Sequence, residues 1–152
     1  MKDLKIAIVT ACKKEIKERI AVHKEKLDEI NQSIESNDTK HGYENDDSQG
    51  ELLGDFERHA KLREEHEDML ITFNNMDFHG GKKSVQEGAI VKTEDKLLLI
   101  SVGIGQLELV GEDLDPVFAI SSKAPIFEAM KGKTNGDSFT FNNKDQKIVE
   151  VY

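Results

Sequence analysis

Carboxylate side chains crowd one polar stretch of the sequence, between residues 38 and 57. The five candidates for chemistry in this stretch are Glu44, Asp46, Asp47, Glu51 and Asp55. Carboxylate oxygens are the ligands that Mg²⁺ prefers, and they can also serve an ion that is shared with a partner. Asp47 and Glu51 are the candidate metal pair. The alternative interpretation of this stretch is an acidic turn that is simply exposed to solvent.

Three histidines and one cysteine are the other residues that could do chemistry. His23, His59 and His66 fall on apolar positions of helical patterns, and only His59 and His66 share one helix, two turns apart. This spacing favours polar residues that fix helix register over a metal site. Cys12 is predicted to be a small packing residue. Since no local signature of a nucleophilic enzyme arranges Ser, His and Asp, we do not expect an enzyme.

The elements that must position the carboxylates are two long helices. Residues 3–36 and 51–76 carry apolar residues at alternating three- and four-residue steps, which is the seam pattern of a coiled coil. Residues 37–50 have the composition of a loop. The sequence therefore predicts an antiparallel helical hairpin whose two seams are Val9, Cys12, Ile16, Ile20, His23, Leu27, Ile30 and Ile34, and Leu52, Phe56, His59, Leu62, His66, Met69, Phe73 and Met76.

Beyond the hairpin the hydrophobic period changes from helical to alternating. We expect a hairpin over 1–78, a linker over 79–84 and a small α+β domain over 85–152. The last domain is predicted to hold a curved antiparallel sheet and one short helix over 125–131, capped by Ser121 or Ser122 and ended by Gly132. Its strands are expected at 89–91, 96–102, 106–110, 117–120, 138–141 and 147–151, with a turn over 142–145.

Composition limits the function classes. The chain has 152 residues and a formal net charge of −9, with 37% hydrophobic and 34% charged residues. A chain of this sign is repelled by phosphate backbones, so direct sequence-specific nucleic-acid binding is not expected. One cysteine cannot form an intramolecular disulfide, and neither a secretory signal nor an apolar run of membrane-spanning length is present. We expect a soluble, cytoplasmic protein with a basic partner surface or a carboxylate-bound cation.

The run ISSKAPIFEAMKGKTNGDSFTF, residues 120–141, resembles the C-terminal signature of the Gre-like bacterial transcription elongation factors. The matching pieces are Ala124-Pro125 opening a short helix, Gly132-Lys133 after it, and Gly136-Asp137 leading into a strand. Residues 85–93, VQEGAIVKT, are similar to the first strand of that domain. The resemblance is strong over about 65 residues at the C-terminal half and only architectural at the N-terminal half.

The resemblance implies an FKBP-like C-terminal domain and a function in transcription. Gre-like factors bind RNA polymerase at its secondary channel and insert the hairpin, whose tip carboxylates help to hold Mg²⁺ at the polymerase's own active centre. That arrangement stimulates cleavage of backtracked RNA. The resemblance further implies a monomer that has no catalytic centre and no stably bound cofactor of its own, and that shares Mg²⁺ with the polymerase. Our candidates for the docking surface are Ser122, Lys123, Pro125, Lys131 and Lys133.

The tip departs from the family pattern at one position. Cleavage-active members carry Asp and Glu three residues apart, and the best alignment places Glu51 at the first position and Gly54 at the second. Two alternatives to cleavage stimulation therefore stand beside it. One is a regulator that binds the polymerase without cleavage, and the other is a coiled-coil adaptor that uses its seam to dimerise.

Overall fold

The computed structural model describes the backbone of residues 1–40, 46–109, 111 and 113–152, and the side chains of these ranges except 37–40 and 46–49. Its packing divides the chain into two compact units. The helical unit comprises Ile16–Leu70. The mixed unit comprises Met1–Glu15 together with Ile71–Tyr152, and each unit is described by itself below.

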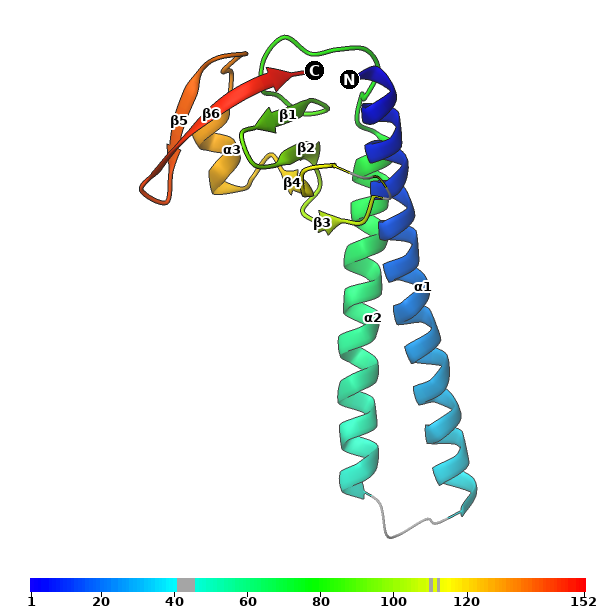
Figure 1. Cartoon of the computed structure of the whole chain (residues 1–152). Coiled ribbons are helices and arrows are strands. Elements are labelled where there is room, and N and C mark those ends of the chain that lie inside the picture. Colours follow the sequence, from blue (N-terminus) through cyan, green and yellow to red (C-terminus); the bar gives the residue numbers. More distant parts are fainter. Residues whose placement is uncertain (41–45, 110, 112) are drawn as a thin grey trace. The chain divides into compact units, whose positions relative to one another are not determined.

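Two long helices supply the helical unit, and each also enters the mixed unit (Figure 1). Helix α1 covers Lys2–Lys40 and helix α2 covers Asp46–Asn74. Residues 37–40 and 46–50, which were expected to belong to a loop, are helical. The acidic start of α2 explains part of the difference, since negative charge near a helix N-terminus stabilises the first turn.

The predicted seam is confirmed by burial. In the helical unit Ile16 and Leu27 are buried, and the other predicted seam residues in this unit are half-buried. In the mixed unit Cys12 and Phe73 are buried, as expected, and Cys12 is a packing residue. The seam shifts by one residue near the start of α1, where Ile8 is buried and Val9 is half-buried.

The mixed unit contains a six-stranded sheet in the order β3-β4-β2-β1-β6-β5 (Figure 1). The strands are β1 (Ile90–Thr93), β2 (Leu97–Ser101), β3 (Gly105–Leu107), β4 (Val117–Ser121), β5 (Ser138–Phe141) and β6 (Lys144–Val151). The expected α+β class is confirmed, but the sheet is mixed, because β2 and β4 pair in parallel. The chain between them forms β3 on the far side of β4, and this detour brings β4 back in the direction of β2.

Both faces of the sheet are buried at its centre. All five residues of β2 are buried, which is typical of a strand covered on both sides. One face belongs to the core formed with α3 (Pro125–Met130), in which Leu98 and Ile100 lie with Phe127 and Met130. On β2, Leu97 and Leu99 alternate with that set and are equally buried, so the opposite face is covered too.

The turn between β5 and β6 is tighter than predicted. Asn142 and Asn143 both have positive φ, at 51° and 60°, the conformation of a two-residue type I′ hairpin turn. Asparagine tolerates this region better than other residues with a Cβ. Strand β6 therefore begins at Lys144, not at residue 147.

Helix α3 begins without the predicted serine cap. Ala124 is the N-cap residue, it makes no side-chain hydrogen bond, and Pro125 occupies the first turn. Proline suits this position because its missing N–H would be unpaired there anyway. Ser121 Oγ instead accepts a hydrogen bond from the Lys123 backbone N–H at 3.1 Å. Gly132 follows the helix with φ of 75°, so the predicted end is confirmed.

Within the part of the chain that the structure describes, neither long helix has a stretch apolar enough to cross a membrane.

Candidate functional site

The described carboxylates at the start of α2 are Glu51 and Asp55. Both are exposed, and Asp55 Oδ1 lies 3.3 Å from an Arg58 guanidinium nitrogen. Residues 47, 51 and 55 follow one another at four-residue steps of one helix, which places their backbone positions on one face. The predicted Glu44 lies outside the described residues, and the side chains of Asp46 and Asp47 do too.

The donor chemistry of this stretch fits a shared magnesium ion but not a complete metal site. Among the side chains described, no group of three or more His, Cys, Asp or Glu residues is arranged to hold a metal ion. Mg²⁺ prefers six oxygen ligands and is often bound through one or two carboxylates with the remaining ligands supplied elsewhere. Glu51 with its neighbours could provide that partial set. The metal assignment to Asp47 and Glu51 therefore stays a prediction.

The predicted docking residues do not all lie together. Ser122 and Lys131 line a shallow hollow of about 480 Å³ beside α3. Lys123 and Pro125 are exposed to solvent and do not line this hollow. Lys133 is half-buried, and its carbonyl accepts a hydrogen bond of 2.8 Å from the Val85 N–H, so its backbone fixes the fold.

The hollow also includes residues that the sequence interpretation missed. They come from the segment before β1, from α3 and from the residues that follow α3: Ser84, Val85, Gln86, Glu87, Phe127, Glu128 and Gly132. Ser122 Oγ donates to Glu87 Oε2 at 3.4 Å, which connects the two sides of the hollow. A signal was available in the sequence, because the resembling runs 85–93 and 120–141 carry all of these residues except Ser84, but the docking prediction used only the second run.

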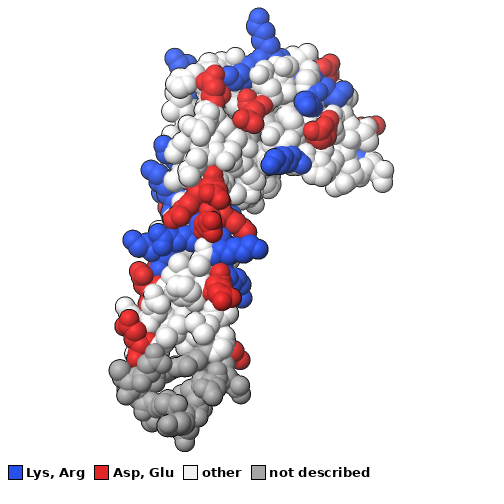
Figure 2. All heavy atoms as spheres, turned by 180° about the vertical axis from the view of Figure 1, so that it is seen from behind, with Lys and Arg blue, Asp and Glu red and all other residues white. Residues whose placement is uncertain are grey.

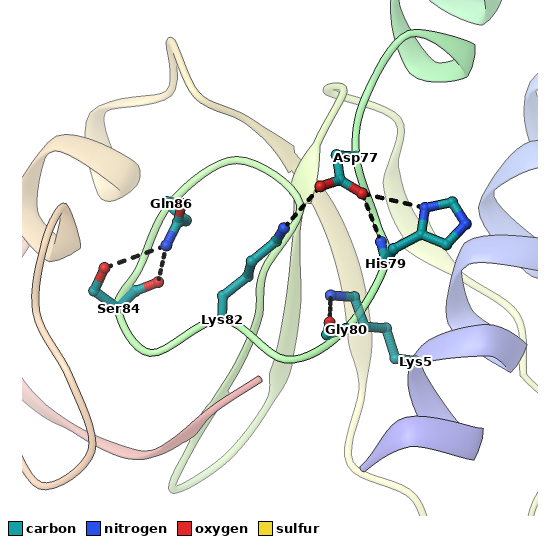
Figure 3. A network of polar contacts seen from close by, with 7 residues as sticks. All are labelled: Lys5, Asp77, His79, Gly80, Lys82, Ser84 and Gln86. Atoms are coloured by element: carbon teal, nitrogen blue, oxygen red, sulfur yellow. Dashed lines mark hydrogen bonds and ion pairs between the residues drawn. The ribbon is translucent and has the colours of Figure 1, made fainter.

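The expected linker is an ordered loop with its own polar network (Figure 3). Asp77 Oδ1 accepts hydrogen bonds from the backbone N–H of His79 at 2.9 Å and from its Nδ1 at 3.2 Å. Lys82 Nζ lies 3.3 Å from Asp77 Oδ2. The His79 backbone N–H, followed by the Lys82 ammonium and the His79 ring, lowers the pKa of Asp77 to about 2. This loop also includes Gly80, whose carbonyl accepts a hydrogen bond of 2.8 Å from Lys5 Nζ.

The three seam histidines form one cluster in the helical unit. The ring centroid of His23 lies 5.4 Å from those of both His59 and His66, and His23 Nδ1 is 3.2 Å from His59 Nδ1. His66 Nδ1 bonds to the carbonyl of Leu62 at 2.7 Å, which fixes the ring on its own helix. Burial first, and then the neighbouring histidines and Arg19, lowers the pKa of His23. The cluster holds α1 and α2 together, as register-fixing residues would.

Acidic and basic side chains are mixed on one face of the described part of the chain (Figure 2). On the face seen in Figure 2, both signs are interspersed instead of forming one extended field. On that face the charges do not resemble the continuous basic stripe of a nucleic-acid-binding protein.

Comparisons with known proteins give a consistent set of structural neighbours at low similarity. No family model matches the sequence, and no curated relative does either. A solved structure described as the transcription factor Gfh1 is 16% identical, covers 93% of this chain and 94% of its own, and has a TM-score of 0.39. GreA factor homolog 1 (Gfh1) of Thermus thermophilus is 14% identical over 92% of this chain and 94% of its own, with a TM-score of 0.33.

A third solved structure, Thermus aquaticus Gfh1, is 15% identical over 91% of this chain and 92% of its own, with a TM-score of 0.33. These identities and TM-scores are too low to carry an argument about fold or function.

Proposed function

We propose that this protein is a Gre-like transcription elongation regulator that binds RNA polymerase at its secondary channel. In this proposal the mixed unit docks on the polymerase, and the helical pair carries carboxylates to the polymerase's active centre. The protein has no catalytic centre of its own and stimulates the polymerase's intrinsic cleavage of backtracked RNA. The observation that carries the proposal is the sequence run 120–141, because each of its motif residues has a definable structural role.

That run forms the last two residues of β4, the following turn, α3 and the whole of β5. Pro125 opens α3, and Gly132 and Gly136 have φ values of 75° and 85° that favour glycine. Asp137 Oδ2 accepts a hydrogen bond of 2.8 Å from the Thr134 N–H, which closes the turn before β5. The spaced motif is therefore built into a consistent fold element, which supports the resemblance over this half of the chain.

The helical pair supports the second half of the proposal. The seam of α1 contacts the seam of α2 within one chain, through His23 with His59 and His66. A pair packed in this way occupies the seam that an adaptor would need for dimerisation. The intramolecular contacts therefore favour a hairpin-bearing regulator over the adaptor, and a monomer is the expected state.

At the tip the chain's own residues would act by presenting negative charge. Mg²⁺, when shared with the polymerase, would stabilise the charge on the phosphate and on the attacking water. Among the described side chains Glu51 has neither a hydrogen-bond partner nor an ion-pair partner, so its oxygens are available for such an ion. Asp55 is paired with Arg58, and that ion pair would compete with metal binding.

A regulator that binds without stimulating cleavage is the second candidate. Gly54 stands where cleavage-active relatives would carry Glu, and it lies within α2 with no atom near its missing side chain. A tip that lacks this carboxylate has one ligand fewer for a shared ion. Binding and cleavage must therefore be measured separately.

The experiment is co-purification with core RNA polymerase, followed by RNA cleavage assayed on stalled complexes. We expect the wild-type protein to bind and to accelerate cleavage. Asp46→Ala, Asp47→Ala and Glu51→Ala should each retain binding and reduce the acceleration by about tenfold or more, as expected for loss of a group that stabilises transition-state charge.

Glu64→Ala is the matched control, since Glu64 is an exposed carboxylate farther along α2. It should leave both binding and cleavage unchanged. Binding without any acceleration would select the non-cleaving regulator. Failure to bind the polymerase at all would exclude both candidates.

A further inference from the structure

An apolar cavity of about 340 Å³, partly open to solvent, lies within the mixed unit between the first turns of α1 and the loop that follows α2. Its apolar walls are Ile6, Val9, Met76, Phe78 and the ring of Tyr152. All the residues that line it belong to the same compact unit. Cavities that hold small organic molecules in proteins occupy about 300 to 1,000 Å³, so this one is in the lower part of that range.

One charged side chain is buried in the wall of this cavity. Lys5 is only 3% exposed, and its Nζ donates a hydrogen bond of 2.8 Å to the carbonyl of Gly80 (Figure 3). The same nitrogen lies 5.5 Å from the centroid of the Tyr152 ring. An ammonium group carries three N–H donors, so the Gly80 carbonyl satisfies only one of them.

The surroundings give Lys5 little negative charge. Buried ammonium groups are normally paired with a carboxylate, but within the described part of the chain Lys5 makes no ion pair. Asp77, the acidic residue of the neighbouring loop, is paired with Lys82 instead. Burial and the nearby Lys82 lower the pKa of Lys5, and Asp77 only partly opposes them.

The polar lining of the cavity also favours an anion. Lys2 lies on the lining with Lys5, whereas the lining residues include neither Asp nor Glu. This contrasts with the whole chain, whose formal net charge is −9. A small anion bound here would lie near two lysines. It would meet no carboxylate of the lining that repels it or competes for these lysines.

We propose that this cavity binds a small organic anion, with an apolar body against Ile6, Val9 and Phe78 and a carboxylate at the Lys5 ammonium. The bound carboxylate fills the donors that the Gly80 carbonyl leaves open. The apolar body fills the cavity and removes its walls from water, which supplies most of the binding free energy. The proposal does not depend on polymerase binding, because every residue that carries it lies in this cavity.

The test uses the full-length protein and two ring compounds of similar shape. The probe is 2-naphthoate, and the matched neutral compound is 2-naphthalenemethanol, which lacks only the negative charge. Binding is measured by isothermal titration calorimetry, and the backbone amides of residues 78–80 are followed by NMR. We expect 2-naphthoate to bind at least tenfold more tightly than the alcohol and to shift those amides.

Lys5→Met is the decisive variant because it keeps most of the buried side chain and removes the charge. It should weaken the binding of 2-naphthoate at least tenfold and leave the binding of the alcohol unchanged. Lys24→Met, an exposed lysine on the same helix, is the control with the same change of charge and should have no effect. Equal binding of acid and alcohol, or an unchanged affinity in Lys5→Met, would overturn the proposal.

A second variant keeps the test valid if Lys5→Met does not fold. Val9→Phe retains Lys5 and enlarges a half-buried wall residue, so it should fill the cavity and abolish binding of both compounds. Undiminished binding of 2-naphthoate to folded Val9→Phe would place the ligand elsewhere. Absence of amide shifts at residues 78–80 in the wild-type protein at millimolar 2-naphthoate would also contradict the proposal.

Discussion

Among the described side chains of the helical unit, residues 16–36 and 50–70, the buried apolar ones are Ile16 and Leu27, and the rest of the predicted seam is half-buried. In the mixed unit, all of β2 is buried and Ile100 lies in a core with residues of α3. The narrow apolar seam between two helices buries less apolar area per residue than a sheet that is covered on both faces. The two units should therefore respond to matched substitutions by different amounts.

The largest difference should come from truncating isoleucine in each unit. Ile100→Ala removes a fully buried side chain and should lower the free energy of unfolding by about 3 to 5 kcal/mol. Ile20→Ala removes a half-buried seam residue and should cost about 1 to 2 kcal/mol. Urea unfolding followed by circular dichroism measures both. Equal costs would show that the seam is packed as tightly as the sheet core.

A glycine of the mixed unit should be nearly as sensitive. Gly88 has φ of 85°, and a Cβ added there would overlap with the Asp77 carbonyl oxygen. Gly88→Ala should cost about 2 to 4 kcal/mol, from backbone strain and overpacking together.

Gly136→Ala isolates the strain, because Gly136 has the same φ and nothing lies within 4 Å of the added Cβ. It should cost about 1 to 2 kcal/mol in the same unfolding measurement. Equal destabilisation of the two alanine variants would show that residues 77 and 88 do not approach each other closely.

In the helical unit, replacing one glycine by alanine should increase the free energy of unfolding instead of lowering it. Gly54 lies inside α2 without a positive φ, and an added Cβ would meet nothing within 4 Å. Gly54→Ala should raise the free energy of unfolding by about 1 kcal/mol, because alanine loses less backbone freedom on forming a helix. Thermal unfolding followed at the helix signal checks this. A decrease in stability would mean that Gly54 serves a turn and not a helix.

A weaker effect is expected from pH, and it should be confined to the histidine cluster. The folded pKa of His23 is lowered from its ordinary value of 6.5, so the unfolded chain binds its proton at a higher pH than the folded chain. The helical unit should keep its full stability above about pH 6.5 and lose some as the pH falls below it.

His23→Gln should reduce this loss, and His79→Gln, at an exposed histidine outside the cluster, should not. Helix unfolding at pH 8 and at pH 5.5 measures the difference. An identical pH dependence in wild type and His23→Gln would remove His23 from the explanation.

Much of the architecture could be predicted because apolar periodicity is a local signal. The seam positions of both helices and the existence of six strands follow from spacing alone. The parallel pairing of β2 with β4 could not be predicted, since it depends on where the long connection after β2 places β3. The tight turn at Asn142-Asn143 was readable in principle, because two asparagines favour a type I′ turn.

The candidate sites were harder to predict than the fold. Burial of Lys5 was missed because a lysine on a helix is normally exposed, although Lys5, Ile8 and Cys12 continue the seam at steps of three and four. The hollow beside α3 depends on residues 84–87, which are distant in sequence from 122–132. In the proposed function the carboxylates near residue 50 act together with a partner, so neither periodicity nor packing of this chain could predict their role.

The central claim is that the start of α2 reaches the active centre of RNA polymerase, and site-specific photo-crosslinking tests it most directly. A photoreactive residue is placed at Leu53 or, as the control, at Ile71, which are 53% and 61% exposed on the same helix. With stalled elongation complexes, the probe at Leu53 should crosslink to the RNA 3′ region or to polymerase residues around the catalytic Mg²⁺, and the probe at Ile71 should not. If neither probe crosslinks to the active centre in a complex that has been shown to form, the claim is contradicted.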